Sequence, residues 1–264
     1  MSANLVKPVV EGPVRLSILE DGAVWKLSLA TPKANILDAA KIEVLRDTFL
    51  KLRQEGDVKA VILEGEGPHF SFGASIEEHM PDRVARMLAG FHGVFAAMLA
   101  ARVVTIAVVR GQCLGGGLEL ASFCQRVFAS PDAKFGQPEI KLGVIAPVAS
   151  VFLPERIGRA NAEDLCLTGR TIAANDALAM GLVDEVALDP SIAASDWIRT
   201  HLLPLSASSL RHAVECLRAP LAARFAVDIE RAERLYLDRL MRTHDAVEGL
   251  QAYVEKRQPN WRNA

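Results

Sequence analysis

The chain has 264 residues, of which 50% are hydrophobic and 23% are charged. This length and balance suit one large globular domain, or one domain with a small appendage, and exclude disordered and collagen-like classes. Lys and Arg together number 30 and Asp and Glu 32, so the formal net charge is −2. Because nucleic-acid-binding domains carry a basic excess, we expect no nucleic-acid partner.

The cysteine pattern and the N-terminal residues indicate in which cellular compartment the protein is expected. The N-terminal residues contain no long apolar run of the kind that a signal peptide needs. The four cysteines include no C-x-x-C pair and are expected to be buried thiols in a reducing environment; they are Cys113, Cys124, Cys166 and Cys216. We therefore expect a cytoplasmic protein.

In chain order, the first half predicts alternating strands and helices. Residues 14–19 and 23–29 predict two strands joined at Asp21-Gly22, a dipeptide typical of hairpin turns. Asp38 predicts the N-cap of an amphipathic helix that ends near residue 54. The following elements are predicted as strands over 58–63, 105–109 and 127–129, and as helices over 82–100 and 117–124. This alternation predicts an α/β core with parallel strand pairing.

From residue 150 onward the pattern is helical, apart from a short β-like run over 182–186. We divide the chain into a β/α core, residues 1–200, and a helical C-terminal region, residues 201–264, which must pack on the core or on another subunit. The apolar stretch 87–109 contains Arg102, which would cost roughly 2–3 kcal/mol inside hydrocarbon. We interpret it as a buried helix followed by a strand and expect no membrane partner.

The first chemical motif is R-G-Q-C-L-G-G-G-L-E-L, residues 110–120, where glycines lead from a strand into a helix. The first N–H groups of a helix lack internal partners and point outward, so they suit an oxygen that gains negative charge. Glu119 falls in that first turn, where the helix dipole favours its ionised form. The alternative is that the glycines only allow close packing and that Glu119 is a solvated acid.

Two further segments carry candidate groups. Residues 69–78, H-F-S-F-G-A-S-I-E-E, contain another glycine turn, whose N–H groups could supply a second donor; an ordinary strand-to-helix loop is the alternative. Glu139 follows Pro138, which fixes the local backbone, so its carboxylate could be a positioned acid rather than a surface glutamate. Two carboxylates near one pocket would separate in pKa and divide acid and base chemistry.

Taken in order, these segments resemble the crotonase (enoyl-CoA hydratase/isomerase) superfamily over residues 14–258. The resemblance is carried by F-S-F-G-A-S-I-E-E, R-G-Q-C-L-G-G-G-L-E-L, F-G-Q-P-E-I-K-L-G, L-T-G-R-T-I-A-A-N-D-A-L-A-M-G-L-V-D-E-V and E-G-L-Q-A-Y-V-E-K-R. It implies an α/β fold with a ββα-repeat core and a helical C-terminal trimerisation region. It also implies a homotrimer, or a homohexamer built as a dimer of trimers.

The resemblance assigns roles to particular residues. The backbone N–H groups of Ala74 and Gly116 correspond to the oxyanion hole. Glu119 and Glu139 correspond to the two catalytic glutamates of hydratases, of which the first helps to activate water and the second exchanges the α-proton. Keeping both acids favours the addition or removal of water over isomerisation.

An acyl-CoA thioester is the substrate that the family implies, so CoA is part of the substrate and no separate cofactor is expected. Lys33 and Ala34 lie in the loop that contacts CoA in the family, and Ile76 corresponds to a residue packed against it. A basic tail offers further partners for the phosphates, unless it is merely solvated; it comprises Lys256, Arg257 and Arg262. The six histidines show no metal-binding spacing, and we expect no metal site.

Two loops depart from the general pattern. The usual G-A-D is here Gly73-Ala74-Ser75, and residues 143–150 read G-V-I-A-P-V-A-S, in which Pro147 and Val148 predict an apolar, rigid wall. Both loops resemble the cyclohexa-1,5-diene-1-carbonyl-CoA hydratases of anaerobic benzoyl-CoA degradation. Two alternatives remain: a general short- or medium-chain enoyl-CoA hydratase, and a non-catalytic crotonase-fold subunit that binds CoA or RNA.

Overall fold

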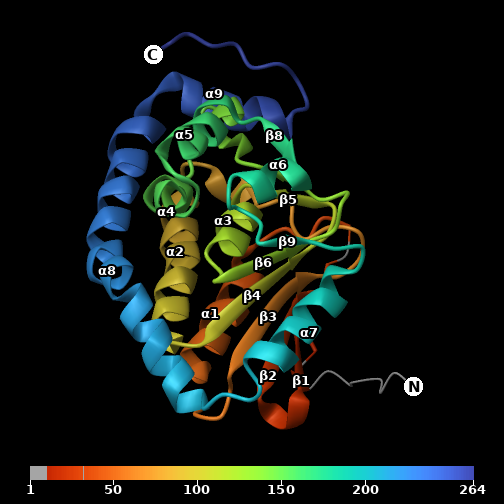
Figure 1. The fold of residues 1–264 in the computed structure, drawn as a ribbon. Helices are drawn as coiled ribbons and strands as arrows, with labels where there is room; N and C mark the ends of the chain where they lie inside the picture. The colour runs from red at the N-terminus through yellow and green to blue at the C-terminus, as the bar shows by residue number, and fades with distance from the viewer. Residues whose placement is uncertain (1–10, 32) are drawn as a thin grey trace.

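The computed structural model describes residues 11–31 and 33–264, and a six-stranded sheet runs through its centre (Figure 1). The strand order is β1-β2-β3-β4-β6-β9, in which β1 and β2 are antiparallel and all other neighbours are parallel. The strands are β1 (Val14–Leu19), β2 (Val24–Leu29), β3 (Ala60–Gly65), β4 (Val104–Val109), β6 (Arg126–Ala129) and β9 (Glu185–Val186). The predicted parallel core is therefore confirmed.

Local signals in the first forty residues act as predicted. β1 and β2 form a hairpin in which Leu19 pairs with Val24, and the chain turns through Asp21 and Gly22 at positive φ. Asp38 caps the following helix, because its carboxylate accepts a hydrogen bond of 3.0 Å from the Lys41 N–H.

A second, three-stranded sheet was not predicted. It contains β5 (Gln112–Leu114), β7 (Lys134–Gly136) and β8 (Thr171–Ala173), in the order β5-β7-β8. Strands of three residues are too short to show a period of two, so they leave no pattern in the sequence. This sheet matters for function because β5 leads into the glycine-rich turn and β7 precedes Glu139.

Helices cover both faces of the large sheet (Figure 1). One core lies between the sheet and α1, α2 and α3, and a smaller one lies between the other face and α7. The helices are α1 (Ala39–Leu52), α2 (Val84–Ala101), α3 (Gly116–Ser122), α4 (Pro147–Ile157), α5 (Arg159–Thr168), α6 (Ala174–Ala179), α7 (Pro190–His201), α8 (Ala207–Arg234) and α9 (His244–Val254). Short 3₁₀ turns add η1 (Glu20–Gly22), η2 (Ile76–His79), η3 (Pro138–Leu142) and η5 (Leu240–Arg242), and a π-helical turn, η4, spans Leu235–Arg239.

The apolar helix α2 is a core helix in this fold. By length and composition alone it could cross a membrane, but 56% of its residues are buried inside the protein. It lies between α1 and α8 (Figure 1). The interpretation of residues 87–109 as a buried helix followed by a strand is confirmed.

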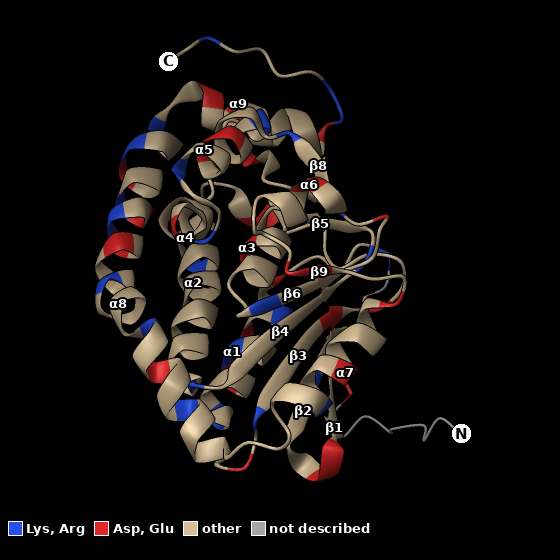
Figure 2. Ribbon diagram, viewed as in Figure 1, with Lys and Arg blue, Asp and Glu red and all other residues tan. Residues whose placement is uncertain are grey.

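The long helix α8 runs along the outside of the molecule and carries charges of both signs (Figure 2). Its buried residues form one stripe, comprising Val214, Leu221, Phe225 and Ile229. Cys216 lies on its exposed side and Cys166 is only half-buried, so the expectation of four buried thiols is confirmed only for Cys113 and Cys124. Leu217 is also exposed, by 82%.

Candidate active site

Glu119 and Glu139 lie on the wall of one cavity of about 70 Å³. Glu119 belongs to the first turn of α3, and Glu139 belongs to η3. The structure thus brings together two carboxyl groups that are twenty residues apart. Most of the remaining wall is apolar, and its larger members are Phe72, Ile76, Met87, Leu88, Phe91, Leu142, Val144, Ile145 and Pro147.

The N-terminus of α4 holds the Glu119 carboxyl group. The Ala149 N–H donates a hydrogen bond of 2.7 Å to Glu119 Oε1, and the Val148 N–H also faces this group. These amides lie in the first turn of α4, which begins at Pro147 and has no internal partner for them. Burial raises the pKa of Glu119 above its usual value, and the hydrogen bonds from the Ala149 and Val148 amides oppose part of that rise. Glu119 therefore has specific support for its ionised form.

The placement of Val148 corrects a prediction. Residues 144–147 line the cavity, as the sequence indicated, but Val148 does not, and it is only 1% exposed. As the second residue of α4 it turns its side chain into the core and offers its N–H to Glu119. Its contribution to the site is therefore made by its backbone.

Glu139 has fewer partners. The Gln137 side-chain amide donates a hydrogen bond of 3.2 Å to Glu139 Oε1, and Glu139 Oε2 is buried with no partner in the described part of the chain. Burial, together with the negative charge of Glu119, raises the pKa of Glu139 to about 8. At neutral pH this carboxyl group holds a proton that it can give to a substrate.

Gly115 allows this placement of Glu139. It has φ +53°, and a Cβ at this position would lie 2.6 Å from Glu139 Oε1. Any side chain here would both strain the backbone and push the carboxyl group out of place. The glycine run thus sets the approach of α3 to η3, in addition to starting the helix.

Two backbone N–H groups lie close together in the cavity wall that also holds the carboxyl groups. A Cβ on Gly116 would lie only 3.2 Å from the Ala74 nitrogen, so the two amides are close neighbours. Neither amide donates a hydrogen bond to another described residue. The Ala74 loop is held by a bridge to Leu37 and by the Ser71 hydroxyl, which accepts from the Gly73 N–H at 3.0 Å. This geometry can receive one oxygen atom between two donors.

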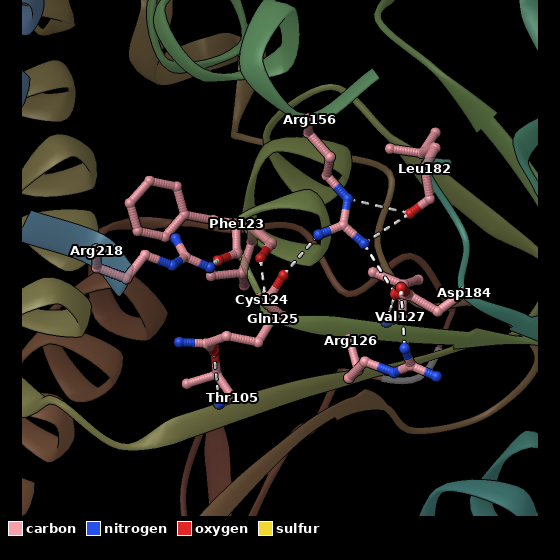
Figure 3. Close-up of polar contacts among 11 residues, drawn as sticks. Thr105, Phe123, Cys124, Gln125, Arg126, Val127, Arg156, Leu182, Asp184 and Arg218 are labelled. Carbon is pink, nitrogen blue, oxygen red and sulfur yellow. Dashed lines mark hydrogen bonds and ion pairs between the residues drawn. The ribbon is translucent and has the colours of Figure 1, made fainter. Parts of the chain in front are cut away.

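Two arginines bind carbonyl oxygens at the C-terminal end of α3 (Figure 3). Arg156 of α4 donates to the carbonyl oxygens of Cys124 and Leu182 and pairs with Asp184 at 3.0 Å. Arg218 of α8 donates to the carbonyl oxygen of Phe123, which caps α3. Cations at the C-terminal end of a helix complement its dipole and satisfy its last carbonyls. They fix α3, and Glu119 with it, against α4 and α8.

A wider groove of about 910 Å³ adjoins the cavity and shares Phe72, Ala74, Ile76, Pro138 and Leu142 with it. Ala34 and Ile76, which the resemblance assigns to CoA binding, line this groove. Lys33 is exposed and is not among the lining residues, so its role as a CoA contact stays a prediction.

Basic side chains gather at this groove from η3 and the C-terminal tail. Lys141, Lys256 and Arg257 line it. Arg257 is paired with Glu248, whose pKa it lowers to about 2, so the two lysines are better placed for an anion. Sequence reasoning missed Lys141, which lies two residues after Glu139 and could have been found from that spacing. Arg262 lies outside the groove lining.

Three polar side chains near the carboxyl groups were also missed. His79 and His92 line the cavity, and the Tyr236 hydroxyl is fully buried with no partner among the described residues. The spacing of the histidines in the sequence tests only for metal binding and gives no sign of this placement. Over residues 11–31 and 33–264, no group of three or more His, Cys, Asp and Glu side chains is arranged to hold a metal ion.

Comparison with known proteins identifies a matching family and similar sequences. The Enoyl-CoA hydratase/isomerase family model matches residues 20–264. A cyclohexa-1,5-dienecarbonyl-CoA hydratase from Thauera aromatica is 50% identical over 95% of this chain and 97% of its own. A probable enoyl-CoA hydratase from Mycobacterium leprae is 36% identical over 93% of this chain and 97% of its own.

Solved structures share the fold. The crystal structure of an enoyl-CoA hydratase from Mycobacterium avium subsp. paratuberculosis superposes with a TM-score of 0.83 at 26% identity, covering 95% of this chain and 98% of that one. An enoyl-CoA hydratase from Bacillus halodurans gives a TM-score of 0.84 at 21% identity, over 91% of this chain and all of that one. The predicted crotonase-like α/β fold is confirmed.

The arginine contacts at α3 lead to a stability prediction. Arg156→Met should lower the free energy of unfolding by roughly 2–4 kcal/mol, because it leaves two buried carbonyl oxygens without their donor and removes one of the two arginines that pair with Asp184. Arg231→Met is the control: its side chain is 78% exposed and lies 3.8 Å from Asp228. It should change stability by less than about 0.5 kcal/mol. Equal effects in a denaturant titration would contradict the buried role of Arg156.

The raised pKa of Glu139 predicts a pH dependence of stability. Its pKa rises from 4.5 in the unfolded chain to about 8 in the fold, so the folded state holds the proton more tightly. The resulting stabilisation is fully present below pH 4.5 and is lost as the pH rises through about 8. Glu139→Gln should flatten this decline, as measured by urea unfolding across that range. An unchanged slope in the variant would show that Glu139 does not titrate this way.

Proposed function

Because the chain belongs to the enoyl-CoA hydratase/isomerase family, we propose that it is a hydro-lyase that adds water to cyclohexa-1,5-diene-1-carbonyl-CoA. The product is 6-hydroxycyclohex-1-ene-1-carbonyl-CoA, and the reaction belongs to anaerobic benzoyl-CoA degradation. The observation that carries the proposal is the 50% identity to the Thauera hydratase over nearly the whole chain. The paired buried carboxyl groups support it, because water addition needs both a base and an acid.

The thioester oxygen binds between the Ala74 and Gly116 N–H groups. Their donors draw electron density toward the oxygen as water attacks, so the negative charge that develops there is stabilised. The CoA portion lies in the adjoining groove, where Ala34 and Ile76 contact it and Lys141 and Lys256 meet its phosphates. CoA is bound as part of the substrate, and the chemistry uses no further cofactor and no metal.

Glu119 and Glu139 divide the acid and base roles. Glu119 is the base, because amide groups support its ionised form, and Glu139 is the acid, because burial keeps it protonated. A water O–H bond breaks and its proton passes to Glu119, while the oxygen bonds to a ring carbon next to C1. The displaced electron pair takes the Glu139 proton. Transfer of the proton from Glu119 to Glu139 then resets the site.

In the cyclic substrate the proton is added to a different carbon atom than in a linear enoyl thioester. In the product C1 keeps a double bond, so the proton cannot be added at the α carbon as it is in a linear enoyl thioester. Addition across C5 and C6 places it on C5, and so does addition of hydroxyl at C2 with a shift of the double bond. Glu139 must therefore reach a carbon beyond C1, which favours a wide, apolar cavity over a narrow channel.

The chain forms a homotrimer or homohexamer in the cytoplasm under this proposal. The exposed apolar side chains of α8, among them Leu217 and Val227, support a self-association surface on the C-terminal helices. A general short- or medium-chain enoyl-CoA hydratase is the second candidate, favoured by the 36% identity to the Mycobacterium leprae protein. A non-catalytic CoA- or RNA-binding subunit fits the two buried carboxyl groups poorly.

Removing either acid tests the division of roles. Glu119→Gln and Glu139→Gln should each reduce kcat by at least about 100-fold, since each deletes one proton transfer. Glu163→Gln, a change at an exposed residue of α5, serves as the control and should keep the wild-type rate. Near-normal turnover in either cavity variant would remove that residue from the mechanism.

Substrate preference tests the proposed reaction. The wild-type enzyme should hydrate the cyclic dienoyl thioester with a kcat/KM at least about 10-fold above that for crotonyl-CoA, since shape discrimination is typically worth 1–3 kcal/mol. In deuterated water the cyclic product should carry deuterium on a ring carbon other than C1. Faster hydration of crotonyl-CoA would favour the general hydratase instead.

A further inference from the structure

His92 is a buried histidine of α2 that none of the preceding steps uses. It is 4% exposed and lines the same cavity as Glu119 and Glu139. Its Nδ1 atom is hydrogen-bonded to the carboxylate of Glu233, which comes from α8. Two helices that are far apart in the sequence therefore combine to place one imidazole ring at the reaction site.

The Glu233 contact fixes both the orientation and the protonation pattern of the ring. A carboxylate can only accept, so Nδ1 carries the proton and donates it to Glu233. Nε2 is the remaining nitrogen of this cavity-lining ring, and in the described part of the chain this buried atom has no partner. A buried polar atom without a partner is destabilising, so this arrangement is expected where a ligand completes it.

The chemistry of the bound acyl group identifies the missing partner, given the function proposed above. The thioester oxygen already has the two N–H donors of Ala74 and Gly116. The rest of the acyl group is a hydrocarbon ring, which offers no hydrogen-bonding atom. The oxygen of the water that adds to the ring, which becomes the product hydroxyl, is the remaining polar atom.

We propose that His92 is a third polar catalytic residue, whose Nε2 atom hydrogen-bonds the attacking water and then the ring hydroxyl. Glu233 is its positioning residue and acts only through Nδ1. The water donates one proton to Glu119 and the other to Nε2, which orients an oxygen lone pair toward the ring carbon. His92 neither gains nor loses a proton over the cycle, so the proton balance between the two glutamates is unchanged.

Two amide variants separate this role from a structural one. The shorter side chain of His92→Asn places its amide near the Nδ1 position and can keep the Glu233 contact, whereas His92→Gln places an amide near the Nε2 position. The proposal predicts that His92→Asn lowers kcat about 10- to 100-fold, as does His92→Phe, with KM changed less than about 2-fold. His92→Gln should stay within about 5-fold of wild type.

The opposite order of kcat values for the two amide variants would overturn the proposal. If His92→Asn kept full activity while His92→Gln lost it, the ring would serve only to bind Glu233. Wild-type rates in all three variants would also exclude a role in catalysis. Thermal unfolding of each variant, followed in parallel, ensures that rates are compared between folded proteins.

Glu233 is tested with a neighbour on the same helix. Glu233→Gln should lower kcat about 3- to 10-fold with little change in KM, because the ring loses its fixed orientation. Glu230→Gln should leave the rate unchanged, since that carboxylate lies on the surface and pairs with Arg234 at 2.6 Å. Equal effects of the two changes would contradict the positioning role.

The substrate series separates this inference from the proposed function. If the wild type hydrates crotonyl-CoA but not the cyclic diene, the proposed substrate is wrong, and the same His92 variants then test the water contact on crotonyl-CoA. If the wild type hydrates the cyclic diene and the His92 variants follow the reverse order, the function stands and the role of His92 fails.

Discussion

Two carboxyl groups share one small apolar cavity, and the rest of the site is organised around the cost of that arrangement. Like charges in a desolvated space cannot both be ionised, so one group must hold a proton. The hydrogen-bond donors around each carboxyl group determine which of the two is protonated. Glu119 receives N–H donors from the start of α4, whereas Glu139 has one side-chain amide and an oxygen without a described partner.

This asymmetry depends on how α3 is held. Glycines let its N-terminal end approach η3 and the Ala74 loop closely, and any side chain at Gly115 would meet Glu139. Arginines from α4 and α8 occupy its C-terminal end. The helix that carries the base is thus fixed at both ends by residues from other parts of the chain. The C-terminal helix α8 contributes to this support and also brings Glu233 to His92.

The features that could be predicted from the sequence are those that depend on interactions between neighbouring residues. The hairpin at Asp21-Gly22, the cap at Asp38 and the start of α3 beside Glu119 each depend on residues within one turn. Pro138 likewise marks the fixed loop that carries Glu139. The sequence pattern also indicated that both acids meet, but only through resemblance to a family, because spacing alone does not bring distant residues together.

What the sequence could not predict depends on contacts between distant segments. The Ala149–Glu119 hydrogen bond spans 30 residues and the His92–Glu233 bond spans 141, and neither leaves a local pattern. Val148 was misplaced because composition identifies an apolar residue but not the side of the helix on which it lies. The short strands β5, β7 and β8 show no two-residue alternation of apolar and polar side chains, although their sheet aligns the glycine turn with Glu139.

The neighbours of the two glutamates give them different charges in the free enzyme at neutral pH. Infrared difference spectroscopy between the wild type and each glutamine variant measures this directly, because protonated and ionised carboxyl groups absorb at different frequencies. We expect a protonated carboxyl band to be lost in Glu139→Gln and ionised carboxylate bands to be lost in Glu119→Gln. The Glu139 band should also disappear as the pH rises through about 8. Loss of ionised bands in both variants at neutral pH would exclude this division of charge.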